Sequence, residues 1–281
     1  MRDKVYSFHG ASAPVWVLFI LLLVFIVLQS LYWLLYGGSH KVLPINVKQR
    51  AQFHSIEAAL ELFASMFGGY PPSDATDDAG QPYCGAMKLA EAIMGQDQMG
   101  WHPDSAFRLD GTDPNMGRLL YTAQTLPVRP GAFLPWENAN AYRLSEIYGK
   151  MRTGPFRGDV YVLCDTYERE QPGGTKAGMP ILYFRANPKG MLHDPNDPDN
   201  PANIYNWRDN LALLDLGVPS DPCTVHPLTD PKRFYLNTRK EKITQSRPYR
   251  ADSYILISAG RDGLYGTADD ICNFDWKYRE R

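Results

Sequence analysis

The chain has 281 residues, and its 29 lysines and arginines against 31 aspartates and glutamates leave a formal net charge of −2. This balance is not typical of a nucleic-acid-binding protein, so we expect no nucleic acid among its partners. The 22 prolines, 23 glycines and 17 tyrosines favour a loop-rich domain with short strands over a helical bundle.

The first element expected along the chain is an uncharged apolar run of 22 residues from Val15 to Tyr36. An α-helix needs about 20 apolar residues to cross the hydrocarbon core of a bilayer. The alternative, a buried helix of a globular core, is disfavoured because such helices are usually amphipathic and this run is apolar all round. The sequence therefore predicts a transmembrane helix over residues 13–37, after a leader-like cytoplasmic segment, 1–12.

The only processing point expected lies before this run, between Gly10 and Ala11. A secretory signal peptide has a shorter apolar core followed by a small-residue cleavage site, so we expect an anchor that is retained. Basic residues flank the run on both sides, and the positive-inside rule gives no orientation. The short leader and the long following chain favour a cytoplasmic N-terminus, with residues 38–281 forming an extracytoplasmic domain.

A second helix is expected from about Val47 to Phe67, after a break at Pro44. Glycines and prolines at 68–72 end it. Four apolar residues recur at i, i+4, i+7 and i+11, which places them on one helix face: Ile56, Leu60, Phe63 and Phe67. An amphipathic helix of this kind must bury its apolar face against another element.

The rest of the chain predicts short elements between long loops. A short helix is expected over 86–93, and one or two helical turns over 143–148. Three strand-like runs follow, and a Pro-Gly-Gly loop at 172–174 between the first two is typical of an antiparallel hairpin: residues 159–164, 181–184 and 254–258.

The expected fold class is α+β. A long N-terminal helix, first membrane-spanning and then amphipathic, packs on a small antiparallel β-sheet, and a long loop-rich insertion occupies about residues 95–250. The four cysteines form no C-x-x-C pair, which disfavours a zinc knuckle or a thioredoxin-type site: Cys84, Cys164, Cys223 and Cys272. Two outcomes stay open for them, disulfides with Cys223–Cys272 as the first candidate, or buried free thiols.

The stretch with the most chemistry runs from Ser258 to Ile271 (SAGRDGLYGTADDI), directly after the third strand. Calcium takes six to eight oxygens from carboxylates and backbone carbonyls. Three carboxylates would supply the charge, with carbonyls near Ala259 completing the shell: Asp262, Asp269 and Asp270. The alternative is a turn-rich loop in which the aspartates cap turns, since the spacing is not that of an EF-hand.

No pattern in the sequence indicates an active site. The six histidines are scattered, and neither a G-x-S-x-G elbow nor a P-loop occurs. Glu137 and Asp165 could in principle pair, but surface or capping roles explain them better. A second acidic run at 193–201 is interrupted by prolines, which fits an exposed loop better than a cation site. Four tryptophans could form a carbohydrate platform, although buried core positions are the stronger reading: Trp101, Trp136, Trp207 and Trp276. We expect a protein that is not an enzyme.

Two stretches resemble type IV pilin-like proteins: residues 49–72 (QRAQFHSIEAALELFASMFGGYPP) and 254–274 (YILISAGRDGLYGTADDICNF). The second is similar to the calcium loop of the major pseudopilin of type II secretion systems, in which a strand leads into Ser-x-Gly-x-Asp-Gly and a later Asp-Ile closes the site. The matching positions are Ser258, Gly260, Asp262, Gly263, Asp270 and Ile271, with Asp269 beside them.

The resemblance implies a structural subunit of a type II secretion or type IV pilus-like filament. It also implies an inner-membrane anchor, a domain in the periplasm or outside the cell, and Ca²⁺ at the matching loop. The implied partners are the lipid bilayer, other pilin-like subunits through helical packing, and the secretion machinery. The chain departs from the family pattern, with Ala11 and Val15 where pilins carry phenylalanine and glutamate. The alternative function is therefore a membrane-tethered extracytoplasmic binding domain on a pilin-like scaffold that does not assemble.

Overall fold

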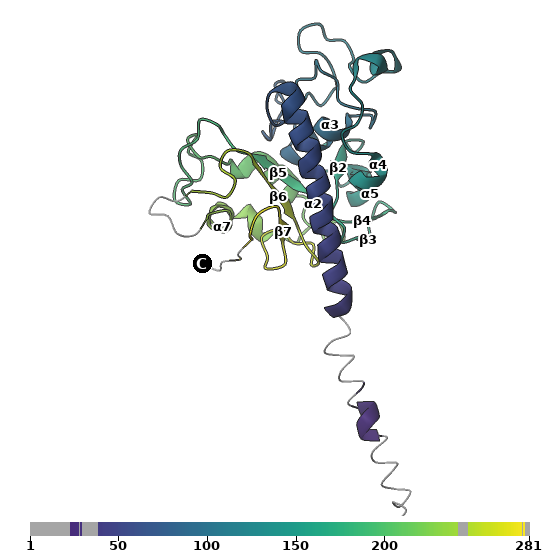
Figure 1. Cartoon of the computed structure of the whole chain (residues 1–281), viewed down its shortest axis with the longest axis vertical. Coiled ribbons are helices and arrows are strands. Elements are labelled where there is room, and N and C mark those ends of the chain that lie inside the picture. Colours follow the sequence, from purple (N-terminus) through teal and green to yellow (C-terminus); the bar gives the residue numbers. More distant parts are fainter. Residues whose placement is uncertain (1–22, 28, 30–38, 241–246, 277, 279–281) are drawn as a thin grey trace, which may run out of the picture. The chain divides into compact units, whose positions relative to one another are not determined.

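The computed structural model describes residues 23–27, 29, 39–240, 247–276 and 278 (Figure 1). The chain divides into two compact units, residues 1–46 and 47–281. In the first unit, residues 23–27 are helical and their apolar side chains are exposed. Within the described ranges, no helix combines the length and apolar character needed to cross a membrane. Most of the predicted span, including Val15 and Tyr36, and the predicted processing pair Gly10–Ala11 lie outside those ranges.

The helix α2 (Ser39–Phe67) contains the predicted amphipathic segment. The prediction of a break at Pro44 is wrong, because the helix continues through this residue. Proline removes only its own N–H from the ladder, so the helix loses one hydrogen bond near its start without ending there. The predicted apolar face is confirmed, since Ile56, Leu60 and Phe63 are all buried.

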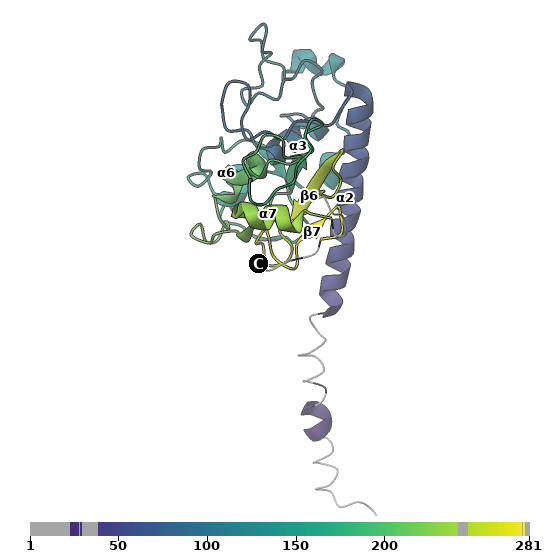
Figure 2. The ribbon, with the colours of Figure 1, turned by 90° about the vertical axis from the view of Figure 1, so that its left-hand side faces the viewer.

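A three-stranded antiparallel sheet forms the centre of the second unit. Its strands follow the order β5 (Leu182–Arg185), β6 (Tyr254–Ser258) and β7 (Ile271–Cys272). All five residues of β6 are buried, because the sheet is covered on both faces. Figure 2 shows α2 running beside β6 and β7, and α3 (Gly85–Met94), whose ten residues are all buried, contacts β5. The predicted helix over 86–93 is thus confirmed.

The predicted hairpin exists only as an irregular ribbon. The Ile181 N–H donates to the Leu163 carbonyl at 2.7 Å, and the Pro-Gly-Gly turn joins β3 (Arg169–Glu170) to β4 (Lys176–Ala177). The two predicted strands nevertheless join different sheets, because β2 (Tyr161–Leu163) pairs with β1 (Ala141–Arg143) while β5 pairs with β6. A strand has two hydrogen-bonding edges, and the sequence does not show which partner takes each.

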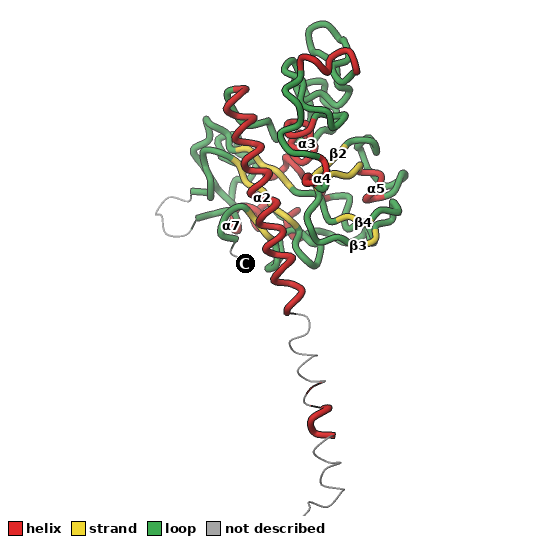
Figure 3. Tube along the Cα trace, turned by 45° about the vertical axis from the view of Figure 1, so that its right-hand side comes forward, coloured by secondary structure: helices red, strands yellow, loops and turns green. Residues whose placement is uncertain are grey.

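Short helices and long loops make up the rest of the second unit, as Figure 3 shows. Residues between 95 and 250 supply core side chains, among them Leu144, Val162 and Phe234. The helices are η1 (Ala123–Val128), α4 (Trp136–Ala139), α5 (Leu144–Tyr148), η2 (Trp207–Asn210), α6 (Leu211–Leu214), η3 (Pro227–Thr229) and α7 (Pro231–Asn237). The loop-rich region is therefore part of the same hydrophobic core as the sheet.

All four cysteines are free thiols. Cys84, Cys164 and Cys272 are buried, and Cys223 is exposed. The predicted Cys223–Cys272 pair is wrong, because one member faces solvent while the other lies in the core. Burial raises the pKa of Cys84 to about 11, so that thiol stays protonated and unreactive.

Candidate functional site

The loop from Ser258 to Ile271 begins and ends on neighbouring strands. Ser258 lies opposite Ile271 in the antiparallel register, so β6 and β7 clamp both ends of the loop. This arrangement brings together the five residues predicted to hold a cation, which come from the two arms of one short loop. The predicted residues therefore all lie in the loop that joins β6 to β7.

The carboxylates of this loop all cap turns. Asp269 Oδ2 accepts the backbone N–H groups of Arg261 at 2.7 Å and Asp262 at 3.0 Å. Asp262 Oδ1 accepts the N–H of Leu264 at 2.7 Å, and Asp270 Oδ2 accepts that of Gly266 at 2.8 Å. The turn-capping interpretation of the sequence is therefore confirmed, and it leaves the question of a cation open.

Three carboxyl groups are concentrated in this small volume. Burial and the neighbouring Asp269 charge raise the pKa of Asp262. Burial acts in the same direction on Asp269, but hydrogen bonds from Thr267 and from backbone N–H groups outweigh it and lower its pKa. Asp270 is buried, and burial together with the charges of the other two aspartates raises its pKa well above the usual value. A bound cation would relieve this repulsion.

Several backbone carbonyls of the loop already accept hydrogen bonds from protein side chains. Arg169 donates to the carbonyls of Arg261 at 2.7 Å and Asp262 at 3.3 Å, and Trp276 Nε1 donates to the Thr267 carbonyl at 2.8 Å. Across the described ranges, no group of three or more histidine, cysteine, aspartate or glutamate side chains is arranged to hold a metal ion. Calcium in this loop would need backbone carbonyls and water in addition to the carboxylates.

The hydroxyl of Ser258 is used within the protein. Its Oγ donates to Asp165 Oδ2 at 2.8 Å and accepts the Gly260 N–H at 3.2 Å. Both Ser258 and the adjacent Ala259 are fully buried. The hydroxyl therefore fixes the start of the loop, and any cation contact from these two positions would come from their carbonyls.

Asp165 connects the loop to α2, a role that sequence reasoning missed. Its Oδ1 accepts the N–H groups of Tyr167 and Met179, and burial raises its pKa to about 7. On either side of it, Gln52 Nε2 donates to the Cys164 carbonyl at 2.8 Å and Gln49 Oε1 accepts the Thr166 N–H at 2.8 Å. The only sequence signal is an aspartate directly after a buried strand, and its partner is Ser258 rather than Glu137.

The second acidic run behaves as the exposed-loop reading predicts. Asp194 Oδ1 accepts the Asn196 N–H at 2.9 Å, and Asp199 pairs with Arg208 at 2.8 Å. His193 is buried with its Nε2 3.0 Å from the Tyr235 carbonyl oxygen. Trp101 and Trp207, two of the four tryptophans considered for a carbohydrate platform, are buried in the core.

A buried glutamate on α3 forms another polar cluster that the sequence did not reveal. Glu91 accepts hydrogen bonds from the hydroxyls of Tyr83 at 2.6 Å, Tyr121 at 2.6 Å and Ser105 at 2.5 Å. Burial raises its pKa, and the hydrogen bonds from these three hydroxyls and from Gln96 oppose that rise. A charged residue within an apolar helix is the only sequence signal for this cluster.

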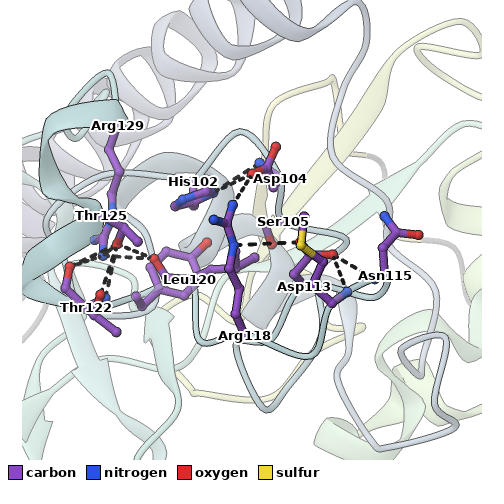
Figure 4. Close-up of polar contacts among 12 residues, drawn as sticks. His102, Asp104, Ser105, Asp113, Asn115, Arg118, Leu120, Thr122, Thr125 and Arg129 are labelled. Carbon is purple, nitrogen blue, oxygen red and sulfur yellow. Dashed lines mark hydrogen bonds and ion pairs between the residues drawn. The ribbon is translucent and has the colours of Figure 1, made fainter.

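The loops that follow α3 are fastened by a chain of polar contacts (Figure 4). Arg129 donates to both oxygens of Asp97 at 2.7 Å and reaches the Thr125 hydroxyl at 2.9 Å. Arg118 lies between Asp104, at 2.9 Å, and Asp113, at 3.8 Å. These contacts close the region between 97 and 129 on itself, which is a structural role.

Comparisons of the chain with protein-family models, with curated proteins and with solved structures give no match. Functional assignment therefore depends on the geometry of the loop and of α2.

Proposed function

We propose that the chain is a membrane-anchored, pilin-like structural subunit of a type II secretion or type IV pilus-like filament. In this proposal the apolar run at 13–37 lies in the inner membrane, and the second unit lies in the periplasm or outside the cell. The C-terminal loop binds Ca²⁺ and holds the sheet together. The exposed face of α2 is the observation that carries the proposal.

The amphipathic part of α2 has a second apolar stripe beside its buried face. Val47, Leu62 and Met66 are exposed by 66%, 54% and 56%. The stripe consists of six uncharged, exposed residues that recur every three or four positions: Val47, Ala51, Ser55, Ala58, Leu62 and Met66. Small and apolar residues in such a row permit close packing of helices, which supports a contact with the helix of another subunit.

The calcium part of the proposal is supported by the three carboxylates that the turns of the loop bring together. Calcium binding would stabilise the folded protein by about 2.7 kcal/mol when free Ca²⁺ is about 100 times the Kd. We expect the melting temperature of the full-length protein to rise in Ca²⁺ and to fall in chelator. Asp262→Asn keeps the acceptor for the Leu264 N–H and removes one charge, so this variant should lose most of the shift.

Differential scanning calorimetry of the detergent-solubilised chain measures this effect. Asp197→Asn is the matched control, because Asp197 is an exposed turn aspartate of the other acidic run and should leave the shift intact. Equal melting of the unsubstituted protein in Ca²⁺ and in chelator would show that the loop binds no calcium.

Assembly through the α2 stripe can be tested by cross-linking in native membranes. A Cys223→Ser background removes the exposed thiol, and Ala51→Cys with Leu62→Cys places two thiols on the stripe. A short bifunctional thiol reagent should then give a ladder of dimers and higher species on a denaturing gel. Packing of α2 helices between copies is the physical reason for this result.

The control variant carries Met151→Cys and Met191→Cys, which are exposed by 97% and 85% and lie outside α2. It should remain monomeric under the same conditions. A stripe variant that stays monomeric, or a control that gives the same ladder, would contradict assembly through this face.

A further inference from the structure

The guanidinium of Arg169 reaches from β3 to the first half of the loop 258–271. Its Nη2 donates to the Arg261 carbonyl at 2.7 Å, and its Nη1 donates to the Asp262 carbonyl at 3.3 Å. Gly263 permits this close approach, because a Cβ at that position would lie 2.8 Å from Nη1 and 3.1 Å from Cζ. One half-buried side chain therefore covers three consecutive backbone positions of the loop.

The segment 165–169 lies along the start of this loop. Asp165 Oδ2 accepts the Ser258 hydroxyl at 2.8 Å. Arg169 and its partner Asp262 each lie four positions further along the chain, so both pairs are separated by 93 positions. Equal separations at two contacts mean that the two stretches run side by side in the same direction. The contact of Arg169 is therefore part of a fixed alignment of two backbone segments.

Asp269 holds the same piece of backbone from its N–H groups. Its Oδ2 accepts the N–H groups of Arg261 at 2.7 Å and Asp262 at 3.0 Å. Arg169 binds the carbonyls of these two residues, so donors and acceptors of the same backbone segment are both fixed. The Asp262 side chain leaves the backbone at this point. Its position relative to Asp269 therefore depends on both sets of contacts.

The charge of Arg169 by itself would oppose cation binding. A fixed positive charge near the site repels a second cation, and its removal would strengthen binding. The planar guanidinium also makes two directed hydrogen bonds, which a lysine ammonium of the same charge does not reproduce. Charge and geometry thus predict opposite effects of substitution at this residue, and the two roles can be separated by experiment.

We propose that Arg169 is a positioning residue of the cation site. Through the carbonyls of Arg261 and Asp262, it holds the Asp262 carboxyl group in place relative to that of Asp269 before a cation binds. The inference rests on the proposed binding of Ca²⁺ by this loop. It adds a residue outside the loop that determines the affinity of the site.

Terbium luminescence of the detergent-solubilised full chain tests this role. Tb³⁺ is a hard cation that takes oxygen ligands as Ca²⁺ does. Trp276 lies beside the loop and can sensitise the emission, because its Nε1 donates to the Thr267 carbonyl at 2.8 Å. Competition with Ca²⁺ gives the Kd of each protein. Arg169→Lys and Arg169→Gln should both weaken binding by about three- to tenfold, because each loses a directed hydrogen bond from a charged donor.

Two kinds of control accompany these variants. Arg143 is a strand arginine whose Nε donates to the Tyr161 hydroxyl at 3.1 Å, outside the loop. Arg143→Lys and Arg143→Gln should therefore leave the Kd unchanged. Trp276→Phe should remove most of the emission, which assigns the signal to this loop rather than to the second acidic run beside Trp207.

Melting curves in chelator separate a weaker site from a poorly folded variant. Arg169→Lys keeps the charge and the aliphatic stem, so it covers the case in which Arg169→Gln does not fold. A purely structural role would lower the melting temperature in chelator and leave the Kd of the folded variants unchanged, which would overturn the inference.

Two further results would also overturn it. Tighter binding in Arg169→Gln with unchanged binding in Arg169→Lys would show that this residue acts only through its charge. Emission retained in Trp276→Phe would place the cation outside the loop. Absence of Tb³⁺ binding by the unsubstituted protein would contradict the calcium part of the proposed function itself, and the inference with it.

Discussion

Replacing Phe63 by alanine is expected to lower the free energy of unfolding by about 3–5 kcal/mol. Phe63 is 3% exposed and lies on the buried face of α2. Its ring centroid is 4.9 Å from Trp101, 4.9 Å from Phe67 and 6.0 Å from Phe133. Truncation would remove the contacts of one ring with all three neighbours and leave a cavity that these rigid side chains cannot fill.

Chemical denaturation followed by tryptophan fluorescence measures this loss, because Trp101 is a direct neighbour of the deleted ring. Leu62→Ala is the matched control on the adjacent residue, whose side chain is 54% exposed. It should change stability by less than about 0.5 kcal/mol. Similar losses for the two variants would mean that α2 does not pack on the domain through its Phe63 face.

The helices and the central strand could be predicted because local patterns determine them. The apolar spacing of Ile56, Leu60 and Phe63 places them on one helix face whatever they pack against. The run at 254–258 is apolar throughout and bounded by turn residues, which is the pattern of a fully buried strand. The strand lies at the expected residues, and α2 ends at the expected Phe67 but begins earlier, at Ser39.

Strand pairing and the buried polar residues could not be predicted from local patterns. The β2 strand pairs with β1, whose three residues carry no strand signal of their own. Asp165 meets Ser258 and Glu91 meets Tyr121, pairs separated by 93 and 30 positions. Such contacts depend on how the chain closes in three dimensions, which local sequence patterns do not reveal.

For the candidate site, too, some features could be predicted from local patterns and others could not. The position of the loop and the convergence of Asp262, Asp269 and Asp270 follow from a strand, a glycine-rich turn and a second strand. The hydrogen bonds of each carboxylate depend on φ angles within the loop, which the sequence does not specify. The contact of Arg169 with the loop carbonyls likewise comes from a strand some ninety positions earlier.

Replacing Gly260 by alanine is the second change with a large expected effect, about 2–5 kcal/mol of destabilisation. Its φ of +63° lies in the left-handed region, which costs a residue with a Cβ about 1–2 kcal/mol. The new Cβ would also lie 2.3 Å from the Asp269 carbonyl oxygen and 2.8 Å from Asp269 Oδ2. Relief of that collision requires the backbone to move, at a further cost of about 1–3 kcal/mol.

Gly174→Ala separates the two contributions. Gly174 has a φ of +84°, and a Cβ there meets nothing within 4 Å, so only the backbone term of about 1–2 kcal/mol should appear. Urea denaturation of both variants measures the difference.

Because the collision pushes Asp269 away from the N–H groups of Arg261 and Asp262, Gly260→Ala should also reduce the Ca²⁺-dependent stabilisation. Gly174→Ala should leave this stabilisation intact. Equal destabilisation of the two variants would mean that Asp269 does not pack closely against Gly260. The three carboxylates would then lack the fixed geometry on which a cation site in this loop depends.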